Sequence, residues 1–423
     1  MKICFRTGIF LVLMAWAGPG WCYPLDGYPY TGILRLEGFR LAQAGKVRGI
    51  KIPAGALLNS DQVDLRLRDR PDFEIPPIDS DFSEAVGKFL GDEADGYAVA
   101  ILDMSDFDHL KYAEHNGTQR SNVGSVGKLL AALGIFQALA DIYPDDEDQR
   151  LKILRSTVVT ADQFIQTDHH KVPFWNLEGK KISYRPIQVG DQASLWTYLD
   201  WMLSASSNAA ASTVIKELML LVHFRNEYPT GAEQAQNFFK QTPKKELTAL
   251  LVRALQDPIS RNGLDLEQLR QGSLFTWKGK QLVPGTTSYA SPRELMRFMV
   301  KLEQGNLVDA FSSREIKRLI YLTQGRIRYA SSPALYNAAV YFKSGSLYKC
   351  QAEPNFKCGK YQGNVVNRLA SLAIVESPAS GQRHYYMVVV MSNVLRKNSA
   401  VAHQTLATRI HRLLESYHRG NNN

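Results

Sequence analysis

The sequence predicts an α+β fold, and three observations support that prediction. Residues 97–102 form a short apolar run, which is typical of a buried strand. Residues 125–140 are apolar on all sides, as expected of a helix buried in a core. Near the C-terminus, two more apolar runs typical of strands, residues 369–375 and 385–391, precede a helical pattern over residues 401–414. Strands and helices therefore both contribute to the main body.

The composition is that of an ordinary globular protein. The chain has 423 residues, of which 45% are hydrophobic and 22% are charged, and this excludes disorder, collagen and coiled coil as its main architecture. It contains 50 Lys and Arg residues against 41 Asp and Glu, a formal net charge of +9. This excess is not gathered into a basic run, so we expect no nucleic-acid partner. It is compatible with binding to anionic cell-envelope polymers without selecting them.

Residues 1–17 have the features of an export signal. Lys2 and Arg6 precede an apolar run over residues 8–17, which ends in Ala15-Trp16-Ala17, the small-x-small pattern of a signal-peptidase site. The run is about ten residues long, whereas a membrane span needs roughly 20. We therefore expect cleavage of this segment, no membrane span, and a location that is periplasmic or secreted.

Residues 18–80 are predicted to form an N-terminal arm or small subdomain that lies on the main body, residues 81–423. Prolines interrupt several short apolar runs between residues 23 and 80, which is typical of irregular structure. The pattern becomes regular from residue 81 onward.

Two cysteines, Cys350 and Cys358, lie eight residues apart around Glu353-Pro354-Asn355, a turn-like stretch. In an oxidising compartment this pair is expected to form a disulfide that closes a hairpin. Two free thiols are the alternative. A zinc site fits less well because no His or second Cys pair flanks them at ligand spacing, and we expect no metal.

The main body begins with a helix and two strands. Residues 82–90 have the pattern of a short amphipathic helix, and the buried strand follows at residues 97–102. A turn around Ser105-Asp106 leads to a partner strand near residues 110–112. The buried helix then begins at Ser125.

The start of the buried helix carries two polar groups, Ser125 and Lys128. Residues three apart lie on the same face of a helix. Burial lowers the pKa of a lysine toward that of a useful base, and a serine beside the positive end of a helix dipole is a candidate nucleophile. The alternatives are a helix N-cap for Ser125 and a surface side chain for Lys128. A phosphate-binding loop is excluded because Asn122 and Leu129 stand where it requires Gly and Ser or Thr.

Two more triplets follow along the chain. An amphipathic helix over residues 196–203 leads into an S-x-N triplet at Ser206 and Asn208. A strand predicted over residues 338–346 contains Lys343-Ser344-Gly345, a K-S-G triplet. Each triplet alone is common by chance, but here all three occur in order and in fitting secondary structure.

The ordered set S-x-x-K, S-x-N and K-[ST]-G resembles that of the penicillin-recognising serine hydrolases, which include the serine β-lactamases and the penicillin-binding D,D-peptidases. Residues 286–295 are similar to the class A β-lactamase segment in which Thr-rich residues and a Pro open a helix. The resemblance covers roughly residues 81–416. It implies a three-layer β-lactamase/transpeptidase-like fold, with an antiparallel sheet flanked by helices plus a mostly helical subdomain.

The resemblance also implies the catalytic roles. Ser125 would attack a carbonyl to form an acyl-enzyme, and Lys128 would accept its proton. Ser206 would relay the proton to the leaving nitrogen. The positive charge of Lys343 nearby would help to keep Lys128 neutral and would suit an anionic substrate.

The binding roles follow in the same way. Asn208 would hold the side-chain amide of the substrate, and Lys343 with Ser344 would bind a carboxylate. Gly345 would let substrate backbone lie close against the strand. The backbone N–H groups of Ser125 and Ser346 would form the oxyanion hole. No cofactor is implied.

One departure from the class A pattern bears on turnover. Class A enzymes carry Glu-x-x-Leu-Asn between the second motif and the Thr-rich segment, and its Glu activates the water that removes the acyl group. None of the glutamates between Asn208 and Thr286 lies in that pattern. Glu246 and Glu267 are candidate substitutes, although solvated helix charges are the simpler interpretation.

We therefore expect an active-site-serine amide hydrolase of class A β-lactamase-like type, which forms an acyl-enzyme with β-lactams or related cell-wall peptides. One alternative, supported by the missing Glu, is a D,D-carboxypeptidase or endopeptidase that acts on the D-Ala-D-Ala stems of peptidoglycan. The other is a penicillin-binding sensor that does not turn over. The expected partner is a β-lactam or a peptidoglycan stem peptide, and the protein is expected to be a monomer.

Overall fold

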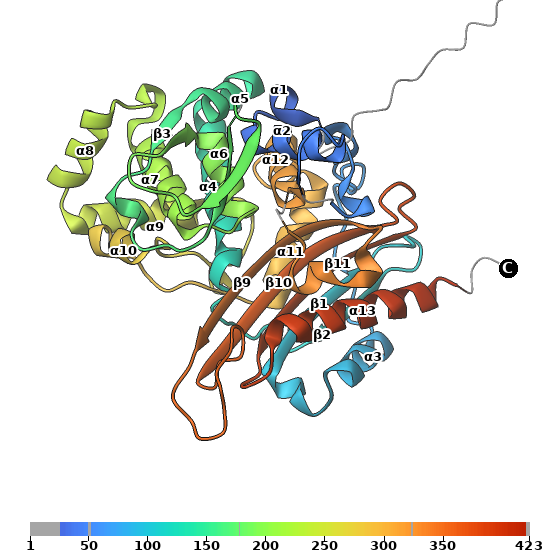
Figure 1. The fold of residues 1–423 in the computed structure, drawn as a ribbon. Helices are drawn as coiled ribbons and strands as arrows, with labels where there is room; N and C mark the ends of the chain where they lie inside the picture. The colour runs from blue at the N-terminus through green and yellow to red at the C-terminus, as the bar shows by residue number, and fades with distance from the viewer. Residues whose placement is uncertain (1–25, 50–51, 177, 323–324, 420–423) are drawn as a thin grey trace, which may run out of the picture.

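A computed structural model describes residues 26–49, 52–176, 178–322 and 325–419 of the chain. The predicted export signal at residues 1–17 lies outside the described residues. Within them the fold is α+β, as predicted, with a five-stranded antiparallel sheet between layers of helices (Figure 1).

The central sheet combines strands from both ends of the main body. Its order is β2-β1-β11-β10-β9, and each neighbouring pair is antiparallel. The strands are β1 (Tyr97–Asp103), β2 (Lys111–His115), β9 (Ala339–Lys349), β10 (Val366–Ser377) and β11 (His384–Asn393). All five were predicted, with boundaries that differ by a few residues. β9, which carries the K-S-G triplet, forms one edge of the sheet.

The sheet has a core on each face because alternate residues of a strand point to opposite sides. In β1, Ala100 and Leu102 belong to the large core shared with the helical subdomain. Ile101 packs in a second core with the helices α3 (Ser80–Leu90) and α13 (Ser399–Tyr417). This burial on both faces explains why β1 is a continuous apolar run rather than an alternating one.

The mostly helical subdomain is built around α4 (Lys128–Ile142), which follows a 3₁₀ turn at Gly124–Gly127. In the described part of the chain, one helix, Gly124–Ile142, is long and apolar enough to cross a membrane. Every residue from Lys128 to Leu139 is buried inside the protein, as in the core helix of a globular domain.

The remaining elements of the main body surround α4 or connect it to the sheet. The helices are α5 (Glu147–Ser156), α6 (Leu195–Leu203), α7 (Asn208–Phe224), α8 (Ala232–Gln241), α9 (Lys244–Arg261), α10 (Trp277–Leu282), α11 (Pro292–Gln304) and α12 (Ala310–Tyr321). The small two-stranded sheets pair β3 (Val158–Thr160) with β6 (Gln192–Ser194), β4 (Val172–Asn176) with β5 (Lys181–Arg185), and β7 (Leu269–Arg270) with β8 (Tyr289–Ala290). Pro292 opens α11, as expected from the Thr-rich segment.

The described part of the N-terminal arm contains α1 (Gly27–Thr31) and α2 (Leu34–Gln43) and is joined to the main body by buried contacts. Arg35 of α2 forms a two-pronged ion pair with Asp200 of α6, with both N···O distances at 2.6 Å, and both side chains are buried. Leu36 lies in the large core. Farther along, Arg66 pairs with Glu376 of β10. The arm therefore shares the core of the main body.

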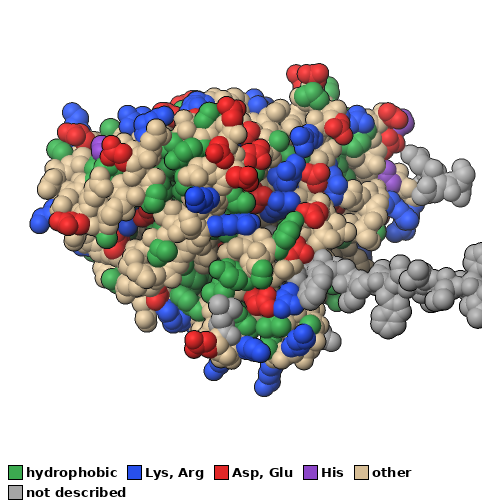
Figure 2. All heavy atoms as spheres, turned by 90° about the horizontal axis from the view of Figure 1, so that it is seen from above, with side chains coloured by type: hydrophobic (Ala, Val, Ile, Leu, Met, Phe, Trp, Pro, Cys, Tyr) green, Lys and Arg blue, Asp and Glu red, His purple; other side chains and the backbone are tan. Residues whose placement is uncertain are grey.

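Surface charge is mixed in sign. On the face shown in Figure 2, Lys and Arg side chains are interspersed with Asp and Glu. Across the described part of the chain several charged side chains are paired, for example Arg293 with Glu114 and Arg261 with Asp141. This face therefore carries no extended patch of a single sign, which agrees with the absence of a basic run in the sequence.

Candidate active site

The three sequence motifs meet where β9 faces the starts of α4 and α7. Ser125 lies in the 3₁₀ turn before α4, and Lys128 is the first residue of that helix. Asn208 is the first residue of α7, and Ser206 lies in the turn before it. Lys343 lies in β9. The fold thus assembles one site from segments that are far apart in the chain.

Lys128 is the centre of a hydrogen-bond network. Its Nζ lies 2.9 Å from Ser125 Oγ, 2.6 Å from Ser206 O and 2.8 Å from Asn208 Oδ1, and the side chain is wholly buried. Lys343 Nζ donates to Ser206 Oγ at 2.8 Å. The structure therefore connects five of the predicted site residues in one network, and both lysines contact Ser206.

The electrostatics of the site favour neutral amines. Burial lowers the pKa of Lys128 to about 7, and the nearby charge of Asp168 opposes this shift. Burial also holds the pKa of Lys343 well below its usual value, and the positive charges of Lys128 and Arg328 act in the same direction. Near neutral pH a large fraction of Lys128 is therefore neutral and can accept a proton across its 2.9 Å contact with Ser125 Oγ.

The turn that carries Ser206 is held by a carboxylate from another segment. Ser206 has a backbone φ of 58°, in the left-handed region that residues other than glycine rarely adopt. Asp168 accepts hydrogen bonds from Ser207 Oγ at 2.9 Å and from the backbone N of Ala209 at 2.8 Å. Burial acts to raise the pKa of Asp168, but its hydrogen bond with His170 and the other bonds it accepts hold that pKa below its usual range. The sequence analysis did not identify Asp168.

Gly345 lets the nucleophile turn lie against β9. A Cβ at this position would overlap the carbonyl oxygen of Val123 and would lie 2.5 Å from the backbone N of Ser125. The sequence analysis assigned the space at Gly345 to substrate backbone, whereas the structure shows that the chain's own backbone uses it. The Ser125 turn therefore packs against Gly345 and Ser346, the segment to which the sequence analysis assigned the second donor of the oxyanion hole.

Arg328 is a second site residue that the sequence analysis missed. Its Nη1 donates to Ser344 Oγ at 2.7 Å, and its Nη2 donates to Ser346 Oγ and to Tyr361 Oη, both at 3.1 Å. The Arg328 guanidinium, which stays charged, and the Lys343 amine thus both lie beside the hydroxyls of β9. Such a cluster suits a carboxylate, because Arg presents its donors in a fixed fork. Arg328 belongs to no sequence motif, so only the fold reveals its position.

The segment after β7 covers the S-x-x-K turn. Gln271 Oε1 packs against Gly127, so that a Cβ at residue 127 would overlap it. Gln271 Nε2 donates to Ser273 O at 2.6 Å. The ring of Phe275 lies with its centroid 4.9 Å from Lys128 Nζ. The amide of Gln271 thus borders the S-x-x-K turn, and the ring of Phe275 lies near Lys128.

Neither candidate substitute for the class A glutamate borders this lysine. Glu246 is exposed on α9, as its interpretation as a solvated helix charge predicted. Glu267 is also exposed and lies near Arg120 and Arg270. It lies in a turn before β7, so the prediction of a helix at this position was wrong.

Known proteins share this fold. The structure of TLA-3 extended-spectrum beta-lactamase is similar with a TM-score of 0.51 and 12% identity, over 79% of this chain and 98% of that one. A beta-lactamase from Sphaerobacter thermophilus has a TM-score of 0.49 and 15% identity, over 79% and 96%. PBP-A has a TM-score of 0.49 and 14% identity, over 81% and 100%. No curated protein matches the chain.

A match to a protein-family model assigns the chain to a family. The model described as the beta-lactamase enzyme family matches residues 81–414, which is most of the chain and includes all three motifs. The chain therefore belongs to the beta-lactamase enzyme family and is a serine hydrolase.

Proposed function

We propose that this serine hydrolase is an amide hydrolase of class A β-lactamase-like type, which forms an acyl-enzyme at Ser125 with β-lactams and related cell-wall peptides. The observation that carries the proposal is the buried contact of 2.9 Å between Lys128 Nζ and Ser125 Oγ. It pairs a nucleophile with a base whose pKa lies near neutral pH. Such substrates lie in the cell envelope, in keeping with the export expected from residues 1–17.

The proposed reaction uses each member of the network. Ser125 Oγ attacks the carbonyl carbon, and its proton passes to neutral Lys128. The backbone N–H groups of Ser125 and Ser346 stabilise the oxyanion, a contribution of about 3–4 kcal/mol for a single donor in well-studied hydrolases. When the C–N bond breaks, Ser206 Oγ gives its proton to the leaving nitrogen and regains one from protonated Lys128, which returns to the neutral amine. Lys343 Nζ donates to Ser206 Oγ at 2.8 Å and holds that hydroxyl in place.

The proposed binding contacts orient an anionic substrate. Ser344 and Ser346 present their hydroxyls together with Arg328, and Lys343 lies beside them, so a substrate carboxylate fits there. Asn208 Oδ1 accepts a hydrogen bond from Lys128 Nζ. This leaves the Nδ2 of Asn208 to donate to the carbonyl of a substrate side-chain amide.

A second candidate function is a D,D-peptidase that acts on D-Ala-D-Ala stems, and the segment that covers Lys128 favours it. This segment offers Gln271 and Phe275. An amide does not take a proton from water at neutral pH as a carboxylate can. A β-lactam adduct whose removal needs a carboxylate base in this segment would therefore persist.

The test is to mix the protein with a chromogenic β-lactam and to follow absorbance and intact mass together, with Ser125→Ala as the control. Sustained hydrolysis that the variant lacks supports the β-lactamase-like function. A burst of one equivalent with a stable adduct supports the peptidase, or a sensor if D-Ala-D-Ala peptides are not cleaved either. The absence of both hydrolysis and an adduct in the unaltered protein would refute acylation at Ser125.

A further inference from the structure

We propose that the exposed end of β9, residues 347–349, and the disulfide-closed loop that follows it, residues 350–365, bind the acyl portion of an acidic peptide. The inference rests on the proposed function, since it concerns the peptide that continues from the carbonyl attacked by Ser125. It assigns a substrate class to the site: an acyl donor with a carboxylate a few residues before the acylated residue.

The direction of the bound peptide follows from the site. The leaving-group carboxylate fits at Ser344 and Arg328, and the attacked carbonyl fits at the backbone N atoms of Ser125 and Ser346. A peptide that runs along β9 from the carboxylate position at Ser344 to the carbonyl position at Ser346 continues past Ser346. The acyl portion therefore reaches the part of β9 that ends at Lys349.

This part of β9 is built to accept an extended chain. β9 is the terminal strand in the sheet order, and its register with β10 continues as far as Lys349 opposite Val366. An edge strand offers backbone N–H and C=O groups to an added strand. Leu347 is 46% exposed and Tyr348 is 40% exposed, so apolar contacts are available on both faces of the strand.

The charge of the segment selects an acidic partner. Lys349, Lys357 and Lys360 are all exposed. Glu353, which carries the negative charge of this segment, is paired with Arg396 at 2.8 Å. Three residues of strand span about 10 Å, so Lys349 lies opposite a peptide residue about three positions before the acylated one.

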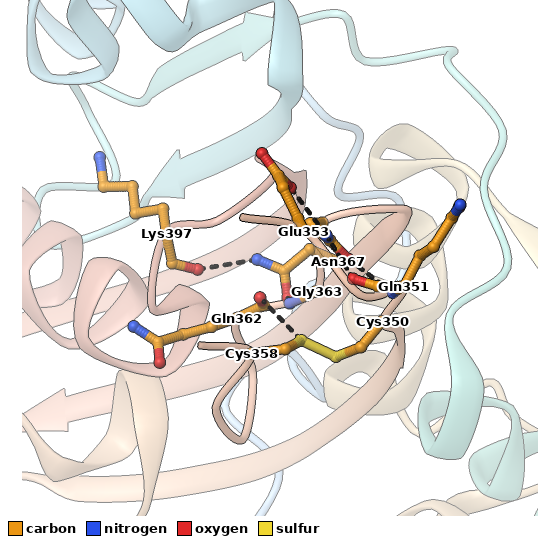
Figure 3. The surroundings of a disulfide bond; sticks show 9 residues. Cys350, Gln351, Glu353, Cys358, Gln362, Gly363, Asn367 and Lys397 are labelled. Atoms are coloured by element: carbon orange, nitrogen blue, oxygen red, sulfur yellow. Dashed lines mark hydrogen bonds between the residues drawn. A yellow bond between two sulfur atoms is a disulfide. The ribbon is translucent and has the colours of Figure 1, made fainter. Parts of the chain in front are cut away.

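The loop is held in place by internal bonds, so binding should cost little conformational entropy. Cys350 and Cys358 are joined by a disulfide, and Gln351 exchanges two hydrogen bonds with Asn364, at 2.9 and 2.8 Å. Figure 3 shows Asn367 of β10 between Glu353 and the disulfide, and its Oδ1 accepts from the backbone N of Gly363 at 3.1 Å. A preformed surface of this kind avoids much of the entropy cost of binding.

The base of the loop also contacts the carboxylate pocket. Tyr361 packs edge-on against Tyr348, with ring centroids 6.0 Å apart, and its hydroxyl accepts from Arg328. Lys360 Nζ lies 5.1 Å from the centroid of the Tyr361 ring. The basic loop and the site around Ser344 therefore form one continuous surface.

Three thioester donors test the proposal. The short donor is N-acetyl-D-alanyl thioester, the acidic donor adds three residues with Glu farthest from the thioester, and the neutral donor has Gln in place of that Glu. The rate of Ser125 acylation is measured for the unaltered protein, for the triple variant Lys349→Gln, Lys357→Gln, Lys360→Gln, and for a control triple variant. The control has the same loss of charge at exposed lysines on the helical subdomain: Lys152→Gln, Lys240→Gln, Lys245→Gln.

We expect the unaltered protein and the control variant to favour the acidic over the neutral donor by about fivefold at low salt, as one exposed ion pair of ordinary strength allows. The loop variant should lose this preference, high salt should remove it, and the short donor should react equally with all three proteins. No preference, or one that persists in the loop variant, overturns this inference while the short donor still reacts. If no donor acylates Ser125, the proposed function itself fails.

Discussion

Acylation of Ser125 should follow the titration of Lys128. Only the neutral amine can accept the serine proton, and burial lowers the pKa of Lys128 to about 7. The acylation rate should therefore rise with pH and level off above about pH 8. At pH 5, two units below the pKa, about 1 in 100 lysines is neutral, so the rate should be about a hundredfold below its plateau.

Asp168→Asn changes this profile in a defined direction. The negative charge of Asp168 raises the pKa of Lys128, so its removal should lower that pKa and move the rising limb to lower pH. The amide oxygen of Asn can still accept from the backbone N of Ala209, which Asp168 binds at 2.8 Å. The turn should therefore persist. The other charges near the site, Lys343 and Arg328, are unchanged in the variant.

The assay is stopped-flow acylation by a fluorescent penicillin between about pH 5 and 9, with intact mass as a check on stoichiometry. Circular dichroism of the variant confirms that it is folded. A flat profile for the unaltered protein would refute Lys128 as the base. A limb that moves to higher pH in Asp168→Asn would refute the role given to the Asp168 charge.

Three further predictions address the covering segment, the arm and the nucleophile turn. Gln271→Glu places a carboxylate beside the S-x-x-K turn and should shorten the lifetime of a β-lactam adduct by about a hundredfold. Intact mass against time measures this, and an unchanged lifetime would argue against the position given to Gln271. Arg35→Met leaves Asp200 buried without its partner and should lower the free energy of unfolding by about 3–5 kcal/mol in denaturant titrations. A loss under about 1 kcal/mol would show that the pair contributes little beyond the desolvation it costs. Gly345→Ala introduces a Cβ that overlaps Val123 O, so the nucleophile turn must shift and acylation should slow about a hundredfold in a protein that remains folded. Acylation at the unaltered rate would contradict that packing.

The fold could be predicted where a buried element produces a continuous apolar run in the sequence. β1 is apolar because it is covered on both faces, and α4 is apolar because it lies in the centre of a subdomain. The end of β9 could not be predicted in this way. Residues 347–349 are exposed, and backbone pairing with β10 alone defines them as strand.

The same distinction applies to the site. Ser125 and Lys128 are separated by one helical turn, so local spacing places them together and the triplets could be recognised. Asp168, Gln271 and Arg328 come from segments whose proximity depends on the packing of the whole domain. Nothing local in the sequence around Asp168 indicated that this loop holds the turn before α7.

The two lysines of the site differ in what a bound anion does to them. A substrate carboxylate beside Lys343 and Arg328 supplies the negative charge that this cluster lacks, and it favours the charged form of Lys343. The same carboxylate would make Lys128 a poorer base if it lay equally close. The contacts of the anion and of the base lie on different elements: Arg328 donates to Ser344 and Ser346 on β9, whereas Lys128 contacts Ser206 O and Asn208 at the start of α7. Ser206 links the two lysines, and a charged Lys343 would repel a proton on Lys128. Substrate binding can therefore neutralise the β9 cluster while Lys128 remains neutral enough to accept the serine proton.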